Sequence, residues 1–462
     1  MIIKTCLSLF WENRLVKSYS KRPLQRKIEG IAIPCVPYFP FLKVKKVGSC
    51  PLFCYDRGFS SGGISSDYPF FELSSIRLEV LTYFDYDSSM NIKADIQALA
   101  KEIGISKIGF TTADDFSYLE KSLRLGVEGG RTTGFEHKVI EERIKPKLSL
   151  ASAKTIISIA VAYPHKLPVP PPKTSYKRGK ITPNSWGVDY HHVLQDKLQR
   201  LAEGIEALTA DFEYKGMVDT GALVDTAVAR RAGIGFIGKN GLVISKEFGS
   251  YMYLGELMTN LDIEPDQPVD YDCGDCRRCL DACPTSCLIG DGTMNARRCL
   301  SFQTQDKGMM ALEFRKKIKT VIYGCDICQI CCPYNKGINN PLASPIDPEL
   351  AMPELVPFLE LSNKSFKKSF GMIAGSWRGK NILQRNAIIA LANAHDRSAI
   401  PKLLEIIDKN NNPIHTATAI WALSELIKKP DQAMLDFMLG LSMAEEETKE
   451  ELERLLTKWQ RA

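Results

Sequence analysis

The cysteines constrain the fold of this 462-residue chain more than any other feature, because ten of its fourteen cysteines lie between Cys273 and Cys332. The first run reads Cys273-x2-Cys-x2-Cys-x3-Cys-Pro284, and a second ends as Cys325-x2-Cys-x3-Cys-Pro333. This spacing is typical of domains that hold two [4Fe–4S] clusters, in which the last cysteine of one run reaches the other cluster. We therefore expect a loop-like segment that folds around metal centres.

If the last cysteine of each run binds the cluster of the other run, the ligands of both clusters can be assigned. Cluster one takes Cys273, Cys276, Cys279 and Cys332. Cluster two takes Cys283, Cys299, Cys325 and Cys328. Cys331 competes with Cys332, which we favour because it directly precedes the proline; Cys287 and Cys331 are then spare thiols. Two zinc sites are the alternative, which eight regularly spaced thiolates disfavour. Two neighbouring clusters imply one-electron transfer.

Charge and hydropathy exclude several classes of protein. The chain has 60 Lys and Arg against 54 Asp and Glu, a net charge of +6, which is too weak by itself to indicate a nucleic-acid partner. It contains no apolar run long enough for a membrane-spanning helix, and its first residues lack a secretory apolar region and a twin-arginine pair. We therefore expect a cytoplasmic protein without a membrane partner, in a compartment where clustered cysteines bind metal.

The pattern of residues divides the chain into four parts. Residues 1–89 show neither helical nor strand periodicity, so we expect a disordered extension or a start assigned too far upstream; an extra domain or a targeting sequence is the alternative. Residues 90–265 alternate helical and strand patterns, which predicts an α/β domain. Residues 266–345 form the cysteine-rich domain. Residues 346–462 are helical, and 386–392 align with 418–424 at a period of 32 residues, which suggests HEAT-like repeats.

Two short motifs invite assignments that their context does not support. Gly233-x-Gly235-x-x-Gly238 fits a dinucleotide-binding pattern, but a helix rather than a strand precedes it. We expect instead a glycine loop that ends a helix and approaches a flat ligand closely. Asp189-Tyr-His191 is similar to a cobalamin motif of methyltransferases that has glycine where Leu194 stands, so we do not assign His191 to cobalt; polar contacts at a helix start are the alternative.

Several longer strings, taken together, indicate a family. They are Val218-Asp-Thr-Gly221, Arg231-Ala-Gly-Ile-Gly-Phe236, Lys239-Asn240, the eight-cysteine pattern, Cys299-Leu-Ser-Phe-Gln-Thr-Gln-Asp-Lys-Gly308 and Gly375-Ser-Trp-Arg-Gly379. From about Met90 to its end the chain resembles the epoxyqueuosine reductases. The resemblance implies a nitroreductase-like α/β domain that binds cobalamin, a ferredoxin-like domain with two [4Fe–4S] clusters, and a HEAT-like domain. It also implies the last step of queuosine biosynthesis, in which Co(I) cobalamin fed by the clusters reduces epoxyqueuosine to queuosine at the wobble position of tRNA.

The resemblance also suggests site residues. Asp219 matches the proton donor, and because a donor must be protonated we expect its pKa to be raised; the alternative is a strand-end aspartate that caps a helix starting near Ala222. The positions that match cobalamin contacts are Arg143, Asp189, Asp219, Lys239 and Asn240. Ser301 and Lys307 match the segment between the cofactor and tRNA.

A basic stripe gives independent support for a tRNA partner. Residues 361–395 contain no Asp or Glu and six basic residues, Lys364, Lys367, Lys368, Arg378, Lys380 and Arg385. Such a stripe can neutralise phosphates, with Trp377 and Phe370 as stacking surfaces; an ordinary basic surface is the alternative. As tRNA contacts we name Lys307, Arg378, Lys380 and Arg385.

Two other functions compete with this interpretation. A reductive dehalogenase also joins cobalamin to two clusters, but is usually exported by a twin-arginine signal and needs no basic helical tail. A ferredoxin-type carrier would need no α/β domain ahead of its clusters. We expect a monomeric enzyme that receives electrons from a reduced donor such as a ferredoxin or a flavodoxin.

Overall fold

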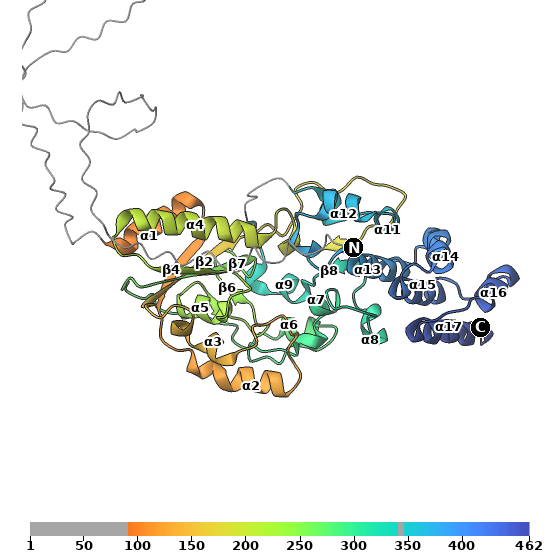
Figure 1. The fold of residues 1–462 in the computed structure, drawn as a ribbon, viewed down its shortest axis with the longest axis horizontal. Helices are drawn as coiled ribbons and strands as arrows, with labels where there is room; N and C mark the ends of the chain where they lie inside the picture. The colour runs from red at the N-terminus through yellow and green to blue at the C-terminus, as the bar shows by residue number, and fades with distance from the viewer. Residues whose placement is uncertain (1–90, 341–345, 462) are drawn as a thin grey trace, which may run out of the picture. The chain divides into compact units, whose positions relative to one another are not determined.

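The computed structural model describes residues 91–340 and 346–461 (Figure 1). The extension expected over residues 1–89 lies outside the described residues. Within them, no helix is both long and apolar enough to cross a membrane. The helical pattern expected just after Met90 is α1, Ile92–Ile103, which starts after the cap Asn91 and ends at Gly104, whose φ of 78° is the left-handed conformation that glycine adopts easily.

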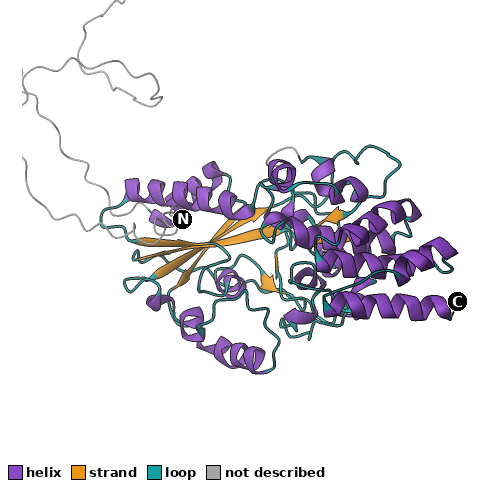
Figure 2. Ribbon diagram, turned by 45° about the vertical axis from the view of Figure 1, so that its right-hand side comes forward, coloured by secondary structure: helices purple, strands orange, loops and turns teal. Residues whose placement is uncertain are grey.

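A four-stranded sheet forms the centre of the first part of the chain. Its strands, in spatial order, are β1 (Lys107–Thr112), β2 (Thr155–Ala162), β7 (Met252–Thr259) and β4 (Tyr214–Met217). All neighbouring strands are antiparallel, and Ile157 pairs with Leu257. Every residue of β2 is buried, because helices cover both faces of the sheet, as Figure 2 shows.

Alternate side chains of the strands enter two different cores, because successive residues of a strand point to opposite faces. Ile157 and Leu257 pack with α1 and α4 (Tyr190–Leu208) on one face. Ile156 and Met258 pack with α5 (Asp225–Arg231) on the other. Two expected boundaries shift: β4 ends before Asp219 rather than on it, and the following helix begins at Asp225 rather than near Ala222.

Short elements make up the rest of residues 91–340. Two pairs of strands accompany the main sheet, the parallel pair β3 (Lys180–Ile181) with β8 (Val321–Tyr323), and the antiparallel pair β5 (Phe236–Ile237) with β6 (Val243–Ile244). The helices are α2 (Glu120–Glu128), α3 (Ile140–Ile144), α6 (Arg278–Ala282), α7 (Leu300–Gln303), α8 (Leu312–Arg315) and α9 (Ile327–Ile330). In the cysteine-rich segment, loops and turns connect helices of only four or five residues and the short strand β8.

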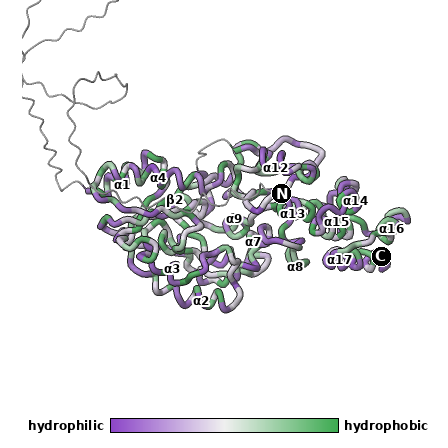
Figure 3. The backbone as a smooth tube through the Cα atoms, viewed as in Figure 1, coloured by the Kyte–Doolittle hydropathy of each residue, from purple (hydrophilic) through white to green (hydrophobic). Residues whose placement is uncertain are grey.

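The described residues after Pro348 are helical, as the sequence predicts. The helices are α10 (Pro348–Ala351), α11 (Leu355–Leu359), α12 (Asn363–Phe370), α13 (Lys380–Asn393), α14 (Ile400–Lys409), α15 (Pro413–Leu426), α16 (Gln432–Leu439) and α17 (Glu446–Gln460). The two aligned segments lie in α13 and α15, which pack against each other through Leu391 and Leu423 in one core (the hydropathy along the chain is drawn in Figure 3). Each is followed by a second helix, α14 or α16.

Candidate active site and cluster sites

Asp219 lies in the loop between β4 and α5, with a φ of 51°. Such a left-handed conformation costs a non-glycine residue about 1–3 kcal/mol, so the surroundings must hold it. Its carboxylate Oδ2 accepts a hydrogen bond of 2.8 Å from the hydroxyl of Tyr190 and lies 3.2 Å from Nε2 of His191, both in the first turn of α4. Asp219 does not cap the next helix, because α5 begins after Val224 with no side-chain cap.

His191 connects Asp219 with a second carboxylate. Its Nδ1 lies 2.7 Å from Oδ1 of Asp189, and the same oxygen accepts the backbone N–H of His191 at 3.0 Å as the N-cap of α4. The hydrogen bond with Asp189, followed by that with Asp219, raises the pKa of His191 to about 9. The polar contacts at a helix start that we considered for Asp189 and His191 are therefore present.

The expectation of a raised pKa for Asp219 is wrong. The hydrogen bond from His191 lowers the pKa of the Asp219 carboxyl, and the Tyr190 hydroxyl adds to the effect, although partial burial opposes it. A carboxylate with two donors is stabilised in its charged form. At neutral pH the proton of this group is therefore held by His191, next to an ionised Asp219.

Two further acids are buried behind this loop. Glu256 lies in β7 opposite Met217 of β4 and Ser158 of β2; it is 0% exposed and neither carboxyl oxygen has a hydrogen-bond partner. Burial raises its pKa well above the ordinary value, and the charges of Asp225 and Asp219 raise it further. Burial also raises the pKa of Asp225 to about 7, and the nearby charge of Asp219 raises it further.

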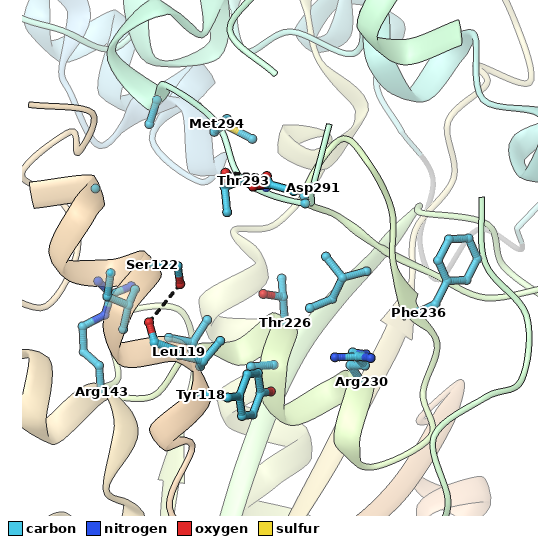
Figure 4. Close-up of a pocket in the computed structure, with 18 of the residues that line it drawn as sticks. Tyr118, Leu119, Ser122, Arg143, Thr226, Arg230, Phe236, Asp291, Thr293 and Met294 are labelled. Carbon is cyan, nitrogen blue, oxygen red and sulfur yellow. Dashed lines mark hydrogen bonds between the residues drawn. The ribbon is translucent and has the colours of Figure 1, made fainter. Parts of the chain in front are cut away.

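A cavity of about 900 Å³ lies on the α5 side of the sheet. Figure 4 shows side chains from α2, α5 and the segment 291–294 around it. Arg131, Arg143 and Arg230 supply positive charge to its wall, and burial lowers the pKa of Arg143. The wall also contains four acidic residues, Glu136, Asp270, Asp272 and Asp291. Gly241 and Gly292, with φ of 79° and 87°, line the cavity without side chains. A wide cavity with charged side chains of both signs and bare backbone has room for a large, flat ligand with polar groups.

The other positions suggested for cobalamin lie around this cavity rather than in its wall. Lys239 donates from Nζ to the carbonyl of Gly274 at 2.7 Å. Asn240 lies in a small cavity among cysteines instead. Ser301 lies in α7, where its carbonyl accepts hydrogen bonds from the side chains of Thr304 and Gln305. Of the residues suggested for cobalamin, Arg143 lies in the wall of the large cavity, and Asp189 and Asp219 are both hydrogen-bonded to His191.

The four cysteines expected at cluster one line a single small cavity. It is formed by Cys273, Cys276, Cys279 and Cys332 with Asn240, Ile244, Pro333 and Tyr334. Cys331 is absent from this lining; its Sγ lies 3.5 Å from the carbonyl of Cys328. Cys332, rather than Cys331, thus lies with the other three cysteines, and its role as the last ligand of cluster one stays a prediction.

The cysteines expected at cluster two also lie close together, with one addition. Cys287, which we expected to be a spare thiol, is 3% exposed and its Sγ lies 3.5 Å from that of Cys283. A hydrogen bond from Cys287 lowers the pKa of Cys299 to about 6. Burial raises the pKa of Cys325 to about 12, with the charges of Cys299 and Cys283 contributing. A metal centre bound by such apposed cysteines would hold them all as thiolates.

The basic stripe is only partly a surface. Arg385 is 1% exposed and its guanidinium donates to the carbonyls of Gln303, Asp306 and Gly308 and to Oδ1 of Asn386. As a tRNA contact it is therefore a wrong prediction, because its hydrogen-bond donors are already used inside the fold. The exposed basic residues of the expected set are Lys307, Lys364, Lys367 and Lys368, while Arg378 and Lys380 are half-buried.

Two exposed aromatic side chains, Trp377 and Phe135, lie beside Arg378. Trp377 is 52% exposed and Phe135 is 47% exposed, and their rings meet edge to face with centroids 5.2 Å apart. The Arg378 guanidinium lies over both rings, at 4.7 Å and 5.3 Å. Trp377 Nε1 donates to Oε1 of Gln305 at 3.0 Å. Phe370, by contrast, is 6% exposed, so the expectation of a second stacking surface there is wrong.

Comparison with known proteins identifies the family. The model described as "Epoxyqueuosine reductase QueG, DUF1730" matches residues 143–220, and the model described as "4Fe-4S double cluster binding domain" matches residues 272–335. The epoxyqueuosine reductase of Lactococcus garvieae (strain Lg2) is 60% identical over 342 residues, which are 73% of this chain and 97% of that protein. This chain belongs to the epoxyqueuosine reductase family.

Solved epoxyqueuosine reductases share the fold. The enzyme from Streptococcus thermophilus is 83% identical, and the match covers 80% of this chain and 100% of that one with a TM-score of 0.79. An epoxyqueuosine reductase solved with an epoxyqueuosine-modified stem loop of tyrosine tRNA is 46% identical, covers 80% of this chain and 99% of its own, and has a TM-score of 0.76. The predicted family and oxidoreductase class are confirmed, and the double-cluster domain supports iron–sulfur clusters over zinc.

Several residues of this epoxyqueuosine reductase site were not found from the sequence. Tyr190 adjoins His191 but carries no pattern of its own, and Phe135 and Gln305 meet Trp377 only through tertiary contacts. Glu256 does leave a signal, since a single acid within the apolar strand β7 is unusual.

Proposed function

We propose that this chain reduces epoxyqueuosine to queuosine at the wobble position of tRNA, the last step of queuosine biosynthesis. Removal of an epoxide oxygen as water, leaving an alkene, consumes two electrons and two protons. The two cysteine sets would supply electrons one at a time through [4Fe–4S] clusters, and the loop of Asp219 would supply protons.

One observation carries the proposal: chain segments that adjoin the proton-holding group and the cysteine site of cluster one line the same cavity. The loop from Asp219 continues into Val224, Thr226 and Ala227, which line the cavity. On another side, Gly241 lines the cavity while the adjacent Asn240 lines the cysteine site. A substrate at the cavity mouth would therefore meet both a proton and an electron supply.

We assign the proton donor role to Asp219 acting with His191. His191 carries the proton at neutral pH, and its Nε2 lies 3.2 Å from Asp219 Oδ2, within reach of a proton transfer. Asp219 would pass this proton to the oxygen that leaves the substrate. The Tyr190 hydroxyl would hold the carboxylate in position.

Cobalamin is the cofactor that we propose for the large cavity. When bound, it supplies a strongly reducing Co(I) centre. Arg143 and Arg230 would bind its negatively charged parts, Gly241 and Gly292 would admit its flat ring, and Asp189, Lys239, Asn240 and Ser301 would fix the surrounding segments. The chain's own residues would thus orient the cofactor and exclude water.

The finer fold assignments belong to the same proposal. We infer a nitroreductase-like cobalamin domain over residues 90–265, a ferredoxin-like domain over 266–345 and a HEAT-like helical domain over 346–462. A sheet with helices on both faces supports the first, and the packing of α13 and α14 against α15, and of α15 against α17, supports the last.

The tRNA would lie over the exposed basic residues and the edge of Trp377. Lys307, Arg378 and Lys380 would contact phosphates or stack on bases. A reduced ferredoxin or flavodoxin would supply electrons to the monomeric enzyme, and the tRNA substrate implies a cytoplasmic location.

The test is an assay with the full chain, reconstituted anaerobically with iron, sulfide and cobalamin. It receives a chemical reductant and tRNA from cells blocked at the last queuosine step, and the nucleosides are analysed by mass spectrometry. Asp219→Asn is compared with Asp196→Asn, a matched control at an exposed position on α4. We expect conversion of epoxyqueuosine to queuosine by the wild type and the control, and a loss of about 10²-fold or more in Asp219→Asn.

Two outcomes would contradict the proposal. No conversion by a wild type whose visible spectrum and iron content indicate both clusters and bound cobalamin would reject the activity. Full conversion by Asp219→Asn would reject its role in proton transfer and leave the activity intact.

A further inference from the structure

Asn240 stands at the boundary between the large cavity and the four cysteines of cluster one. It lies in the turn between β5 and β6, where Gly241 donates its N–H to the carbonyl of Gly238 at 2.8 Å. Gly241 faces the large cavity, while Asn240, which is 2% exposed, faces the cysteines. This turn is therefore a wall shared by the two sites.

The orientation of the Asn240 amide is fixed by a neighbour. Its Oδ1 accepts the backbone N–H of Leu242 at 3.3 Å, and only an oxygen can fill that role. A side chain on Gly238 would occupy the same space, because a Cβ there would lie 2.7 Å from Asn240 Oδ1. The amide nitrogen Nδ2 must consequently point away from Leu242.

Nδ2 is buried and has no hydrogen-bond partner. A buried N–H without an acceptor is unfavourable, and folded proteins rarely leave one. Among the residues that line the cysteine cavity, Tyr334 is the other one with a side-chain N or O atom; its hydroxyl donates to the carbonyl of Asp272 at 2.9 Å and makes no hydrogen bond with Nδ2. The missing partner must therefore come with whatever the four cysteines bind.

Lys239 strengthens this connection. Its Nζ donates to the carbonyl of Gly274, the residue that follows Cys273, at 2.7 Å. The turn is thereby attached to the ligand loop itself, so that Asn240 keeps its place next to the cysteines when a cluster is bound.

We infer that the Asn240 amide donates an N–H···S hydrogen bond to cluster one and raises the reduction potential of that cluster. The inference rests on the proposed function in so far as the four cysteines hold a [4Fe–4S] cluster. Hydrogen bonds to cluster sulfurs are among the features that set its potential. A donor stabilises the reduced cluster more than the oxidised one, because reduction adds negative charge. Asn240 is then a positioning and tuning residue on the electron path toward the large cavity.

The experiment measures each cluster's midpoint potential by EPR-monitored redox titration of the full chain, reconstituted with iron and sulfide but without cobalamin. Asn240→Leu removes the donor without adding charge. Asn240→Asp keeps an acceptor for the Leu242 N–H and also removes the donor. In Asn240→Leu we expect the ratio of reduced to oxidised cluster one at a given potential to fall about tenfold. For a one-electron couple this corresponds to a midpoint potential about 59 mV lower. Cluster two serves as the internal control and should shift little.

Asn240→Asp should lower the potential of cluster one at least as much. An exchangeable-proton coupling to reduced cluster one, seen by ENDOR in the wild type, should be lost in both variants. An unchanged cluster one potential in an Asn240→Leu protein with full iron content would overturn the inference. Weaker cobalamin binding in that variant with an unchanged potential would likewise overturn it and assign the amide to cobalamin. Because neither readout uses tRNA, failure of the reductase assay is distinguishable from failure of this inference.

Discussion

Replacement of Arg385 by Met separates a buried structural role from a tRNA contact. The guanidinium makes five hydrogen bonds to three backbone carbonyls and to the side chain of Asn386. Each unsatisfied buried acceptor costs about 1–3 kcal/mol, and the variant recovers part of this because a charged group no longer has to be desolvated. We therefore expect Arg385→Met to lower the free energy of unfolding by about 3–5 kcal/mol, measured by anaerobic urea titration with tryptophan fluorescence.

The matched control is Lys380→Met, five residues earlier on the same helix. Among the described residues, Lys380 has no ion pair or buried hydrogen bond that the substitution would break, so the free energy of unfolding should change by less than about 1 kcal/mol. If Lys380 contacts a phosphate, the slope of log affinity for tRNA against log salt should fall by about 0.7 in Lys380→Met and stay unchanged in Arg385→Met. A stable Arg385→Met protein with a reduced salt slope would refute the reasoning.

Three other predictions follow from the buried groups. Glu256 keeps its proton in the folded state but ionises in the unfolded chain, so the free energy of unfolding should fall by up to about 1.36 kcal/mol per pH unit above the unfolded pKa of Glu256. Glu256→Gln should remove this dependence on pH in urea titrations from pH 5 to 8. An unchanged dependence would contradict the raised pKa. His191 carries its proton below about pH 9 and loses it above, so single-turnover rates should decline as the pH rises through 9. In His191→Gln this decline should disappear and the rate should fall about 10²-fold. A decline that persists in the variant would exclude His191 as the proton source. Cys332→Ala should lose the iron of one cluster in an iron assay while Cys331→Ala keeps both, and the reverse result would exchange their roles.

The sequence by itself determined the parts of the protein that depend on local pattern. The cysteine spacing predicted a double-cluster segment because ligands close in the chain must be close in space. The helix from Ile92 and the strand from Thr155 followed from the periodicity of apolar residues, because a face that will be buried is apolar whatever it packs against. The family followed from strings of residues such as Val218-Asp-Thr-Gly221.

The tertiary structure alone decided what each charged side chain does. A basic residue in a basic stripe looks the same whether it faces solvent or, like Arg385, is enclosed by the carbonyls of residues 303–308. The pKa of Asp219 was predicted in the wrong direction because it depends on His191, which is 28 positions earlier in the chain but 3.2 Å away. Protonation state and hydrogen bonding are set by neighbours in space, and those neighbours come from segments whose meeting no local pattern records.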